Sequence, residues 1–245
     1  MNLGDHVGDA PDKVAANRAA LQSAIGSRPV FLKQVHGSQV LVLDAATGDG
    51  DVADACITSQ RQLACTIMVA DCLPVLLSTE DGSMVAAAHA GWRGLAGSGT
   101  NGSEWSGKGV LESVYESFSS LVPVPDAKSA MKIIAWLGPC IGPSAFEVGE
   151  EVKVAFELAQ PQASRFFEPA GPGKYRADLA GLARLRLQAL GVTDVYGNDG
   201  GLAWCTHGNP SRFFSHRRDA AAVAVSGFGN GLGTTGRMAA AIWRI

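Results

Sequence analysis

Two histidines and one cysteine carry most of the chemical information in this chain. His36, Cys72 and His89 each end or begin an apolar, strand-like run. We therefore expect their side chains to project from the rim of a rigid sheet, where ligands and catalytic groups are commonly held. Two imidazoles and one thiolate form a donor set that suits zinc, and three protein ligands leave a fourth tetrahedral position for water or substrate. The three residues thus predict an open, catalytic zinc site.

A histidine taken alone is more often a core residue than a ligand, so the prediction depends on the three residues together. Each has small neighbours, which permit close approach of the backbone to a ligand. These neighbours are Gly37, Ala70, Ala90 and Gly91. Asp71, next to the thiol, has two interpretations: it accepts a hydrogen bond that fixes the tautomer of a metal-binding imidazole, or it forms a turn at the strand end.

An arginine follows the second histidine closely. Arg93 lies in the tripeptide Trp92-Arg-Gly94. A guanidinium beside a cationic site indicates a bound anion, because its planar fork matches phosphate or carboxylate. The alternative is a surface arginine paired with a carboxylate. We take Arg93 as the leading anion clamp.

A second basic cluster lies in Ser211–Asp219. Its aromatic residues suit the anchoring of a strand, and it ends in His216, Arg217 and Arg218. These side chains are suited to stacking on a purine or to donating hydrogen bonds to phosphate. For Arg218 an ion pair with Asp219 is the other interpretation.

Two further motifs are left outside the predicted metal site. Cys140 has no adjacent cation to stabilise a thiolate, so we interpret it as a packed, unreactive thiol. Cys205 and His207 are two residues apart and share one face of a strand, but no other element is expected to converge there. His6, in a Gly-Asp-His turn, is placed near the site.

Composition narrows the class of protein. A chain of 245 residues that is 47% hydrophobic can bury a large core, and we expect one domain over residues 1–245. The sequence contains no run of about 18 apolar residues and no signal-peptide pattern, which favours a cytoplasmic protein without membrane contact. Five cysteines, an odd number, indicate reduced thiols. A net charge of −3 gives no footprint for nucleic acid, so a small substrate is expected.

Periodicity predicts alternating helices and strands, and hence an α/β protein with two sheet layers covered by helices. The expected helices are 11–25, 109–121, 150–158 and 178–190, the first capped by Asp12. The expected strands are 29–35, 39–43, 63–69, 74–78, 84–88, 131–137, 192–196, 212–215 and 239–245. His36-Gly37 is the predicted turn between the first two strands, and Asp81-Gly82 a hairpin turn. The segments 96–108 and 220–235 are predicted as loops or an extended hairpin.

Seven short segments in this order resemble the YfiH family, and together they run over nearly the whole chain. They are Asn2-Leu-Gly-Asp-His-Val-Gly-Asp9, Gln34-Val-His-Gly37, Ala70-Asp-Cys-Leu-Pro74, His89-Ala-Gly-Trp-Arg-Gly94, Leu137-Gly-Pro-Cys-Ile-Gly-Pro143, Phe213-Phe-Ser-His-Arg-Arg-Asp219 and Thr235-Gly-Arg-Met238. Members of this family are called laccase-domain proteins, polyphenol oxidases, purine nucleoside phosphorylases or peptidoglycan editing factors.

The resemblance implies a four-layer α/β/β/α fold with mixed sheets, shared with cysteine hydrolases. It also implies zinc bound by the residues that match His36, Cys72 and His89. The implied activity is phosphorolysis of adenosine, inosine, guanosine and methylthioadenosine, together with deamination of adenosine.

Two features depart from the family. Its members usually begin with a further strand and an Arg-Gly-Gly turn, so we expect either a start upstream of Met1 or an altered pocket wall. The segments 96–108 and 220–235 are longer than usual, which is expected to reshape access to the site.

The sequence therefore predicts a zinc-dependent purine nucleoside phosphorylase and adenosine deaminase. The candidate catalytic residues are Cys72, His89 and Arg93. The candidate substrate-binding residues are Arg93, Asn2, His216 and Arg217. The expected partners are a purine nucleoside and phosphate, with the chain a monomer or homodimer.

Three alternatives stay open. A copper-dependent oxidase of phenols would use the same two histidines and cysteine, but a multicopper oxidase needs more histidines than the five present. An amidase acting on peptidoglycan precursors would use Cys72 as a nucleophile activated by His89. A non-catalytic zinc protein is the third alternative.

Overall fold

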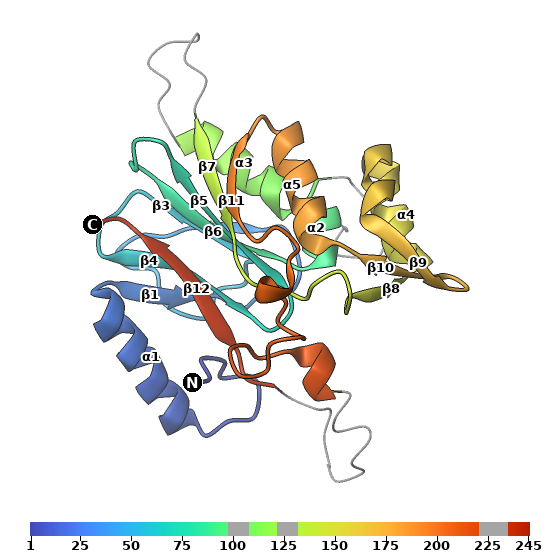
Figure 1. The fold of residues 1–245 in the computed structure, drawn as a ribbon. Helices are drawn as coiled ribbons and strands as arrows, with labels where there is room; N and C mark the ends of the chain where they lie inside the picture. The colour runs from blue at the N-terminus through green and yellow to red at the C-terminus, as the bar shows by residue number, and fades with distance from the viewer. Residues whose placement is uncertain (98–107, 122–131, 221–234) are drawn as a thin grey trace.

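The computed structural model describes residues 1–97, 108–121, 132–220 and 235–245. The segments 96–108 and 220–235, predicted as loops, lie almost entirely outside these ranges. The described elements form a mixed α/β structure of several sheets with helices against them (Figure 1).

A mixed six-stranded sheet forms the larger layer, in the order β11-β7-β5-β6-β3-β2. Its strands are β2 (Val40–Val42), β3 (Ala55–Thr58), β5 (Leu73–Thr79), β6 (Val85–Ala90), β7 (Ile133–Leu137) and β11 (Asp194–Gly197). β5 pairs antiparallel with β6 and β7, whereas β2 runs parallel to β3 and β11 parallel to β7. The turn between β5 and β6 contains Gly82 with a φ of 67°, so the predicted hairpin turn is confirmed.

A three-stranded sheet packs against one face of the larger sheet. Its order is β1 (Arg28–Phe31), β4 (Leu63–Val69), β12 (Met238–Trp243), with β1 parallel and β12 antiparallel to β4. All seven residues of β4 are buried. Apolar side chains of both sheets form a common core, and β4 is buried along its whole length, with Thr66 as its one polar residue. This core includes Val30, Cys65, Ile67, Cys56, Val85 and Ala87.

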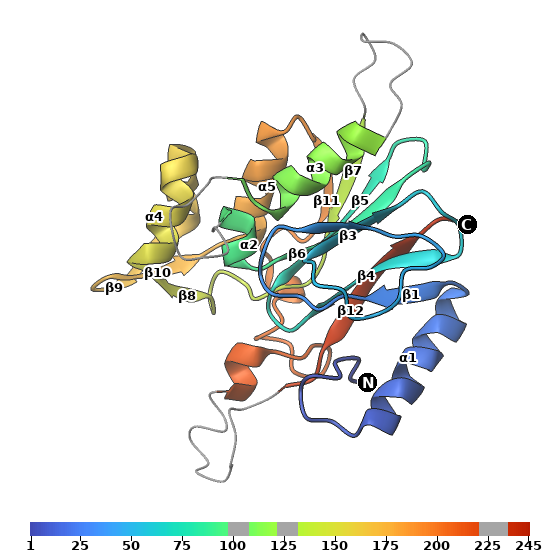
Figure 2. The same ribbon diagram turned by 180° about the vertical axis from the view of Figure 1, so that it is seen from behind.

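Helices lie against the sheets on their outer sides (Figures 1 and 2). Helix α1 (Pro11–Ile25) packs beside β1, and α3 (Val110–Leu121) buries its apolar stripe on the six-stranded sheet. Next to α3 lies α5 (Leu179–Ala189), and the short α2 (Trp92–Ala96) follows β6. A small sheet, β8 (Glu147–Gly149), β10 (Lys174–Ala177) and β9 (Phe167–Gly171), carries α4 (Glu150–Ala159). Two short 3-10 helices span Pro161–Phe166 and Leu202–Trp204.

Several local predictions are confirmed, since α1 and β4 have the expected bounds. The predicted N-terminal cap of α1 is not formed. Ala10 precedes α1 without a side-chain cap, and Asp12 lies within the first turn, so the predicted Asp12 cap is wrong. By contrast, Asp178 does cap α5, accepting a hydrogen bond from the backbone N–H of Gly181.

The prediction of a hairpin around His36-Gly37 is wrong. The strand before it ends at Phe31 and belongs to the three-stranded sheet, whereas β2 belongs to the six-stranded sheet. The intervening segment therefore crosses from one sheet to the other. The expected strand at 212–215 is also wrong: these residues form turns and irregular backbone that lead into a helical segment starting at His216. The sequence interpretation missed β3, β8, β9 and β10, all of which are five residues or shorter.

Within the described residues, no helix combines the length and the apolar character needed to cross a membrane.

Candidate metal centre

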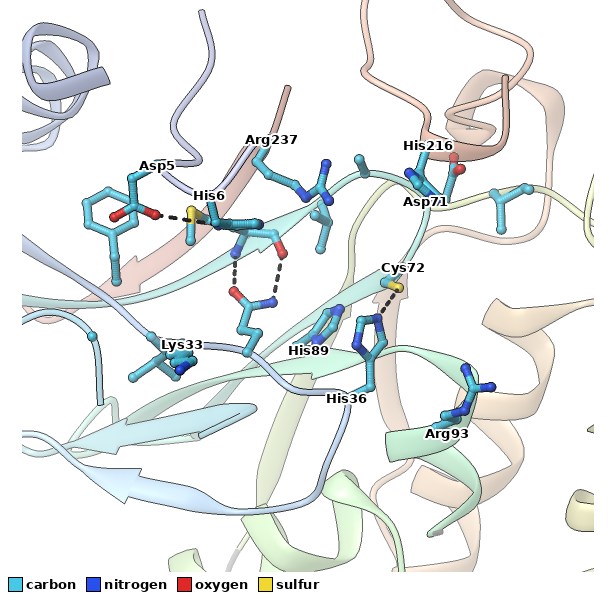
Figure 3. Close-up of a pocket in the computed structure, with 18 of the residues that line it drawn as sticks. Asp5, His6, Lys33, His36, Asp71, Cys72, His89, Arg93, His216 and Arg237 are labelled. Carbon is cyan, nitrogen blue, oxygen red and sulfur yellow. Dashed lines mark hydrogen bonds and ion pairs between the residues drawn. The ribbon is translucent and has the colours of Figure 1, made fainter. Parts of the chain in front are cut away.

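Tertiary structure brings His36, Cys72 and His89 together at one place (Figure 3). One ligand atom from each residue lies within 4.8 Å of those of the other two, and Cys72 Sγ is 3.7 Å from Nε2 of His36. The two imidazole rings meet edge to face, with centroids 4.8 Å apart. His89 is buried, Cys72 is partly exposed and His36 is exposed, so the group is open to solvent on one side.

The three residues reach this place from different kinds of backbone. His89 lies within β6, and Cys72 directly precedes β5 in the turn that follows β4. His36 is not at a strand end as expected: it lies in the crossing segment, five residues after β1, with a left-handed φ of 62°. That conformation is uncommon for a residue with a Cβ, which indicates that surrounding contacts hold it.

Asp54 supplies those contacts, and the sequence interpretation missed it. This fully buried carboxylate accepts backbone N–H groups of Val35, His36 and Gly37 at 3.1, 2.8 and 2.7 Å. It also accepts Nδ1–H of His89 at 2.8 Å, which leaves Nε2 of that ring for Cys72. The available signal was an acidic residue inside the apolar run Val52–Ile57, where an unpaired charge would be costly.

Asp71, the residue expected to orient an imidazole or to form a turn, does not contact either histidine. Its carboxylate accepts hydrogen bonds from Thr206 Oγ1 at 2.5 Å, Ser215 Oγ at 3.1 Å and the backbone N–H of Arg217 at 2.7 Å. Asp71 is buried and has a φ of 91°. The turn before Cys72 is therefore anchored to the segment that carries His216 and Arg217.

In the group formed by His36, Cys72 and His89, a Cys72 thiolate lies beside a His89 imidazolium. Burial raises the pKa of Cys72, but the neighbouring His89 charge and hydrogen bonds from both histidines outweigh it and lower that pKa to about 6. Burial lowers the pKa of His89, but the Cys72 thiolate and Asp54 outweigh it and raise that pKa to about 9. The pKa of Asp54 is lowered because its bonds to His89 and the backbone exceed the effect of burial. At neutral pH the metal-free group is thus an ion pair backed by a carboxylate.

A cavity of about 810 Å³ opens over this group. Of the predicted substrate-binding residues, Arg93, His216 and Arg217 line it, as does His6. Arg93 extends from α2 with its guanidinium 4.4 Å from the Trp92 ring centroid. Apolar walls come from Phe31, Met68, Ile141 and Phe146. A further arginine that the sequence interpretation did not single out, Arg237, also lines the cavity.

Three other residues considered in the sequence, Asn2, Arg218 and Cys140, are not among the cavity-lining residues. Asn2 is buried and is not among the cavity-lining residues; its side chain binds the backbone of Gly4 and Arg237. Arg218 forms the ion pair with Asp219 at 2.9 Å, the second of its two interpretations. Cys140 is buried, and burial raises the pKa of its thiol far above the ordinary value, as expected for an unreactive thiol.

Sequence comparison places these features in a known family. The sequence model of a family described as "Multi-copper polyphenol oxidoreductase laccase" matches residues 1–245. The chain belongs to this family. Among its curated relatives is the protein named "Purine nucleoside phosphorylase YfiH" of Escherichia coli strain K12, 43% identical over 100% of this chain and 86% of that protein. Purine nucleoside phosphorylase PA4543 of Pseudomonas aeruginosa is 43% identical over 99% of this chain and 85% of its own length.

Solved structures of relatives agree with the fold. Neisseria meningitidis protein NMB0706 is 42% identical, with a TM-score of 0.77 over 99% of this chain and 85% of its own. The Bacillus licheniformis hypothetical protein YfiH is 26% identical, with a TM-score of 0.80 and coverage of 99% and 85%. The resemblance to the YfiH family is therefore confirmed, and with it the mixed α/β class of the fold.

Proposed function

We propose that this chain is a metal-dependent purine nucleoside phosphorylase in which His36, Cys72 and His89 hold zinc. The observation that carries the proposal is the convergence of these three ligand atoms within 4.8 Å in the wall of a cavity that is also lined by arginines. Relatives that align over nearly the whole chain carry the name purine nucleoside phosphorylase, which supports the same reaction class.

The donor set fits zinc. Cys72 is a thiolate at neutral pH, and Asp54 holds Nδ1–H of His89, so Nε2 is the nitrogen that donates to zinc once the metal displaces its proton. The 3.7 Å from Cys72 Sγ to His36 Nε2 is close to the edge of about 3.5 Å in a tetrahedral zinc site. When bound, zinc supplies Lewis acidity and lowers the pKa of water to about 7.

Zinc is preferred here to copper because of the number of donors. A multicopper oxidase requires many imidazole ligands, whereas the chain has five histidines. The part of the chain that the structure describes holds one group of three clustered ligands, His36, Cys72 and His89. Metal analysis with an absorption spectrum tests this choice, because a blue band would indicate copper–thiolate bonding.

Arg93 is proposed to bind phosphate. It stands at the start of α2, directly after the strand that carries His89, so the guanidinium and the ligand group share one rigid support. Its five N–H donors match phosphate oxygens in pairs. In the reaction the C1′–N9 bond breaks with its electron pair on the purine, and a phosphate oxygen bonds to C1′. The proton of hydrogenphosphate ends on the released base.

The decisive experiment is incubation of the purified protein with inosine or adenosine and phosphate, followed by analysis of free base and ribose 1-phosphate. Arg93→Lys keeps the charge but loses the fork, so it should raise the KM for phosphate with zinc content unchanged. Arg165→Lys, at an exposed residue that does not line the cavity, serves as the matched control. Absence of ribose 1-phosphate with zinc-loaded wild-type protein would exclude the reaction.

We also propose the finer features that the family resemblance implies. Adenosine, inosine, guanosine and methylthioadenosine are the proposed substrates, and deamination of adenosine is a proposed second activity, detected as inosine or hypoxanthine. Residues 1–245 are proposed to form one domain with layers α/β/β/α, as in cysteine hydrolases. Support comes from α1 and α3 on the outer sides of the two packed sheets and from the family match over all residues.

One observation favours a second candidate function. A thiolate with a pKa of about 6 beside an imidazolium with a pKa of about 9 is the arrangement that cysteine hydrolases use for nucleophilic attack. Cys72 would then be the nucleophile of an amidase acting on peptidoglycan precursors. Full activity after removal of zinc, with a covalent adduct on Cys72 during turnover, would favour this function over the first.

A further inference from the structure

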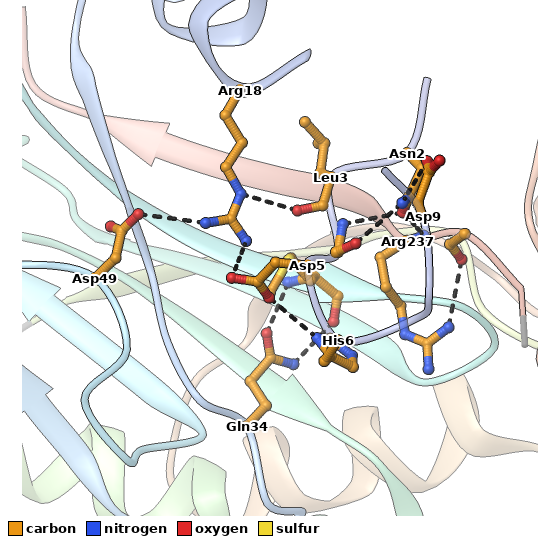
Figure 4. A network of polar contacts seen from close by, with 12 residues as sticks. Asn2, Leu3, Asp5, His6, Asp9, Arg18, Gln34, Asp49 and Arg237 are labelled. Atoms are coloured by element: carbon orange, nitrogen blue, oxygen red, sulfur yellow. Dashed lines mark hydrogen bonds and ion pairs between the residues drawn. The ribbon is translucent and has the colours of Figure 1, made fainter. Parts of the chain in front are cut away.

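Arg237 is held in the cavity by contacts that specify its position closely (Figure 4). It directly precedes β12, and its backbone N–H donates to Asn2 Oδ1 at 2.8 Å while its carbonyl accepts from the N–H of Leu3 at 3.0 Å. A Cβ on Gly4 would lie 2.8 Å from Arg237 Cγ, so the absence of a side chain there gives room to the stem of the arginine. The segment Asn2–Gly4 therefore acts as a support for this arginine.

The guanidinium of Arg237 is fixed but has donors to spare. Nη1 donates to the carbonyl of Thr235 at 2.8 Å and lies 3.4 Å from that of Gly236. The nearby carboxylate of Asp71 is already engaged by three donors. Among the residues that the structure describes, no carboxylate forms an ion pair with Arg237, although its side chain is partly buried. Asp71 and the Cys72 thiolate act on Arg237 through their charge without a hydrogen bond to it, so an acceptor on a ligand would satisfy its unused N–H donors.

The position of Arg237 identifies the part of the substrate that it would meet. Arg93 and Arg237 lie on opposite sides of His36, Cys72 and His89 (Figure 3). With phosphate at Arg93, Arg237 is left to meet the nucleoside on the other side of this group. The cavity next to Arg237 is walled by Met68 and Val69 of β4, the strand that pairs with β12, and this apolar wall suits a flat base.

We propose that Arg237 binds the acceptor edge of the leaving purine, donating to N7 and O6, and thereby favours 6-oxopurine over 6-aminopurine nucleosides. An arginine fork matches these two acceptors, whereas adenine presents an N6 donor at the second position. The same contact stabilises the electron pair that the purine keeps when the C1′–N9 bond breaks. This inference rests on the proposed phosphorolysis, and it adds the residue that selects the base.

The test compares Arg237→Met and Arg237→Gln with the wild-type protein. Arg237→Met keeps the length of the side chain without its donors, so the ratio of kcat/KM for inosine to that for adenosine should fall by about tenfold or more. The KM for phosphate should stay unchanged. A Gln amide pairs with N6 and N7 of adenine, so Arg237→Gln should shift the preference toward adenosine, an effect that a purely structural role would not produce. Arg165→Met is the neutral control.

Binding of free bases to the zinc-loaded protein, measured by calorimetry, gives a readout that does not depend on turnover. Wild-type protein should bind hypoxanthine about tenfold more tightly than adenine, and Arg237→Met should remove that difference. Equal binding of the two bases to wild-type protein would overturn the inference even where a variant fails to fold. So would an unchanged inosine-to-adenosine ratio in a folded variant, or a raised KM for phosphate alone. If wild-type protein forms no ribose 1-phosphate, the proposed function fails, and the base-binding comparison still decides the role of Arg237.

Discussion

Nδ1 of His89 donates a hydrogen bond of 2.8 Å to Asp54, and the same carboxylate holds the backbone of the segment that carries His36. One buried acidic residue thus sets the ring orientation of one histidine and the left-handed backbone of the other. The two imidazoles come from different elements, β6 and the crossing segment, so their relative position depends on this single group.

Replacing Asp54 should therefore weaken metal binding strongly. Each oxygen of Asp54 accepts two of the four hydrogen bonds, and in Asp54→Asn an amide nitrogen that cannot accept replaces one oxygen, so two of the four are lost. We expect a decrease of zinc affinity of about 10- to 100-fold, measured by competition with a chromogenic chelator. Asp51→Asn changes an exposed acid nearby and is the matched control. Equal zinc affinity of the Asp54 variant and the control would show that Asp54 does not position the ligands.

Gly91 leaves the space in which the ligand group is assembled. A Cβ there would lie 2.8 Å from Cδ2 of His36 and 3.2 Å from Sγ of Cys72. His36 is exposed and can move away, so Gly91→Ala should lower zinc content while the free energy of unfolding falls by at most about 1–3 kcal/mol. Gly48→Ala, where a Cβ meets nothing within 4 Å, should change neither quantity. Zinc content and thermal unfolding of both variants check the prediction.

The Cys72 thiol should titrate far below an ordinary cysteine in the metal-free protein. Its pKa is about 6, because the His89 charge and both imidazole hydrogen bonds outweigh burial. Thiolate absorbance near 240 nm, taken as the difference between wild type and Cys72→Ala, should rise with a midpoint near this pH. As the pH falls through about 6 the thiolate takes up a proton, so zinc affinity should decrease there. A midpoint near 8.5, the value of an unperturbed thiol, would contradict this electrostatic arrangement.

Substitution at position 72 separates a metal ligand from a nucleophile. Cys72→His retains a donor for zinc but cannot form a thioester or other thiol adduct. With Cys72 as a ligand, this variant should keep measurable zinc and a trace of nucleoside cleavage, whereas Cys72→Ala should lose both. A variant that binds zinc but is inactive, together with a substrate adduct on wild-type Cys72 in intact-protein mass spectrometry, would support the nucleophile instead.

The local sequence pattern was sufficient to predict the helices and strands that have clear signals within a few residues. The apolar run Leu63–Val69 is β4, and the helix over Pro11–Ile25 begins at a proline and ends before Gly26 in a left-handed conformation. These signals act over a few residues, because burial, capping and backbone freedom are local properties. The identity of the three candidate ligands also followed from residue chemistry and from segments that resemble the family.

Only the tertiary structure decided how those ligands are held. Whether the run after Gly37 pairs with β1 or joins the other sheet depends on contacts far away in sequence, so the hairpin prediction was wrong. Asp54 acts on His36 and His89 from 18 and 35 residues away. Arg237 meets Asn2 across 235 residues. A sequence states which groups are present, but the partner that satisfies a buried charge or an unused donor is set by packing between distant segments.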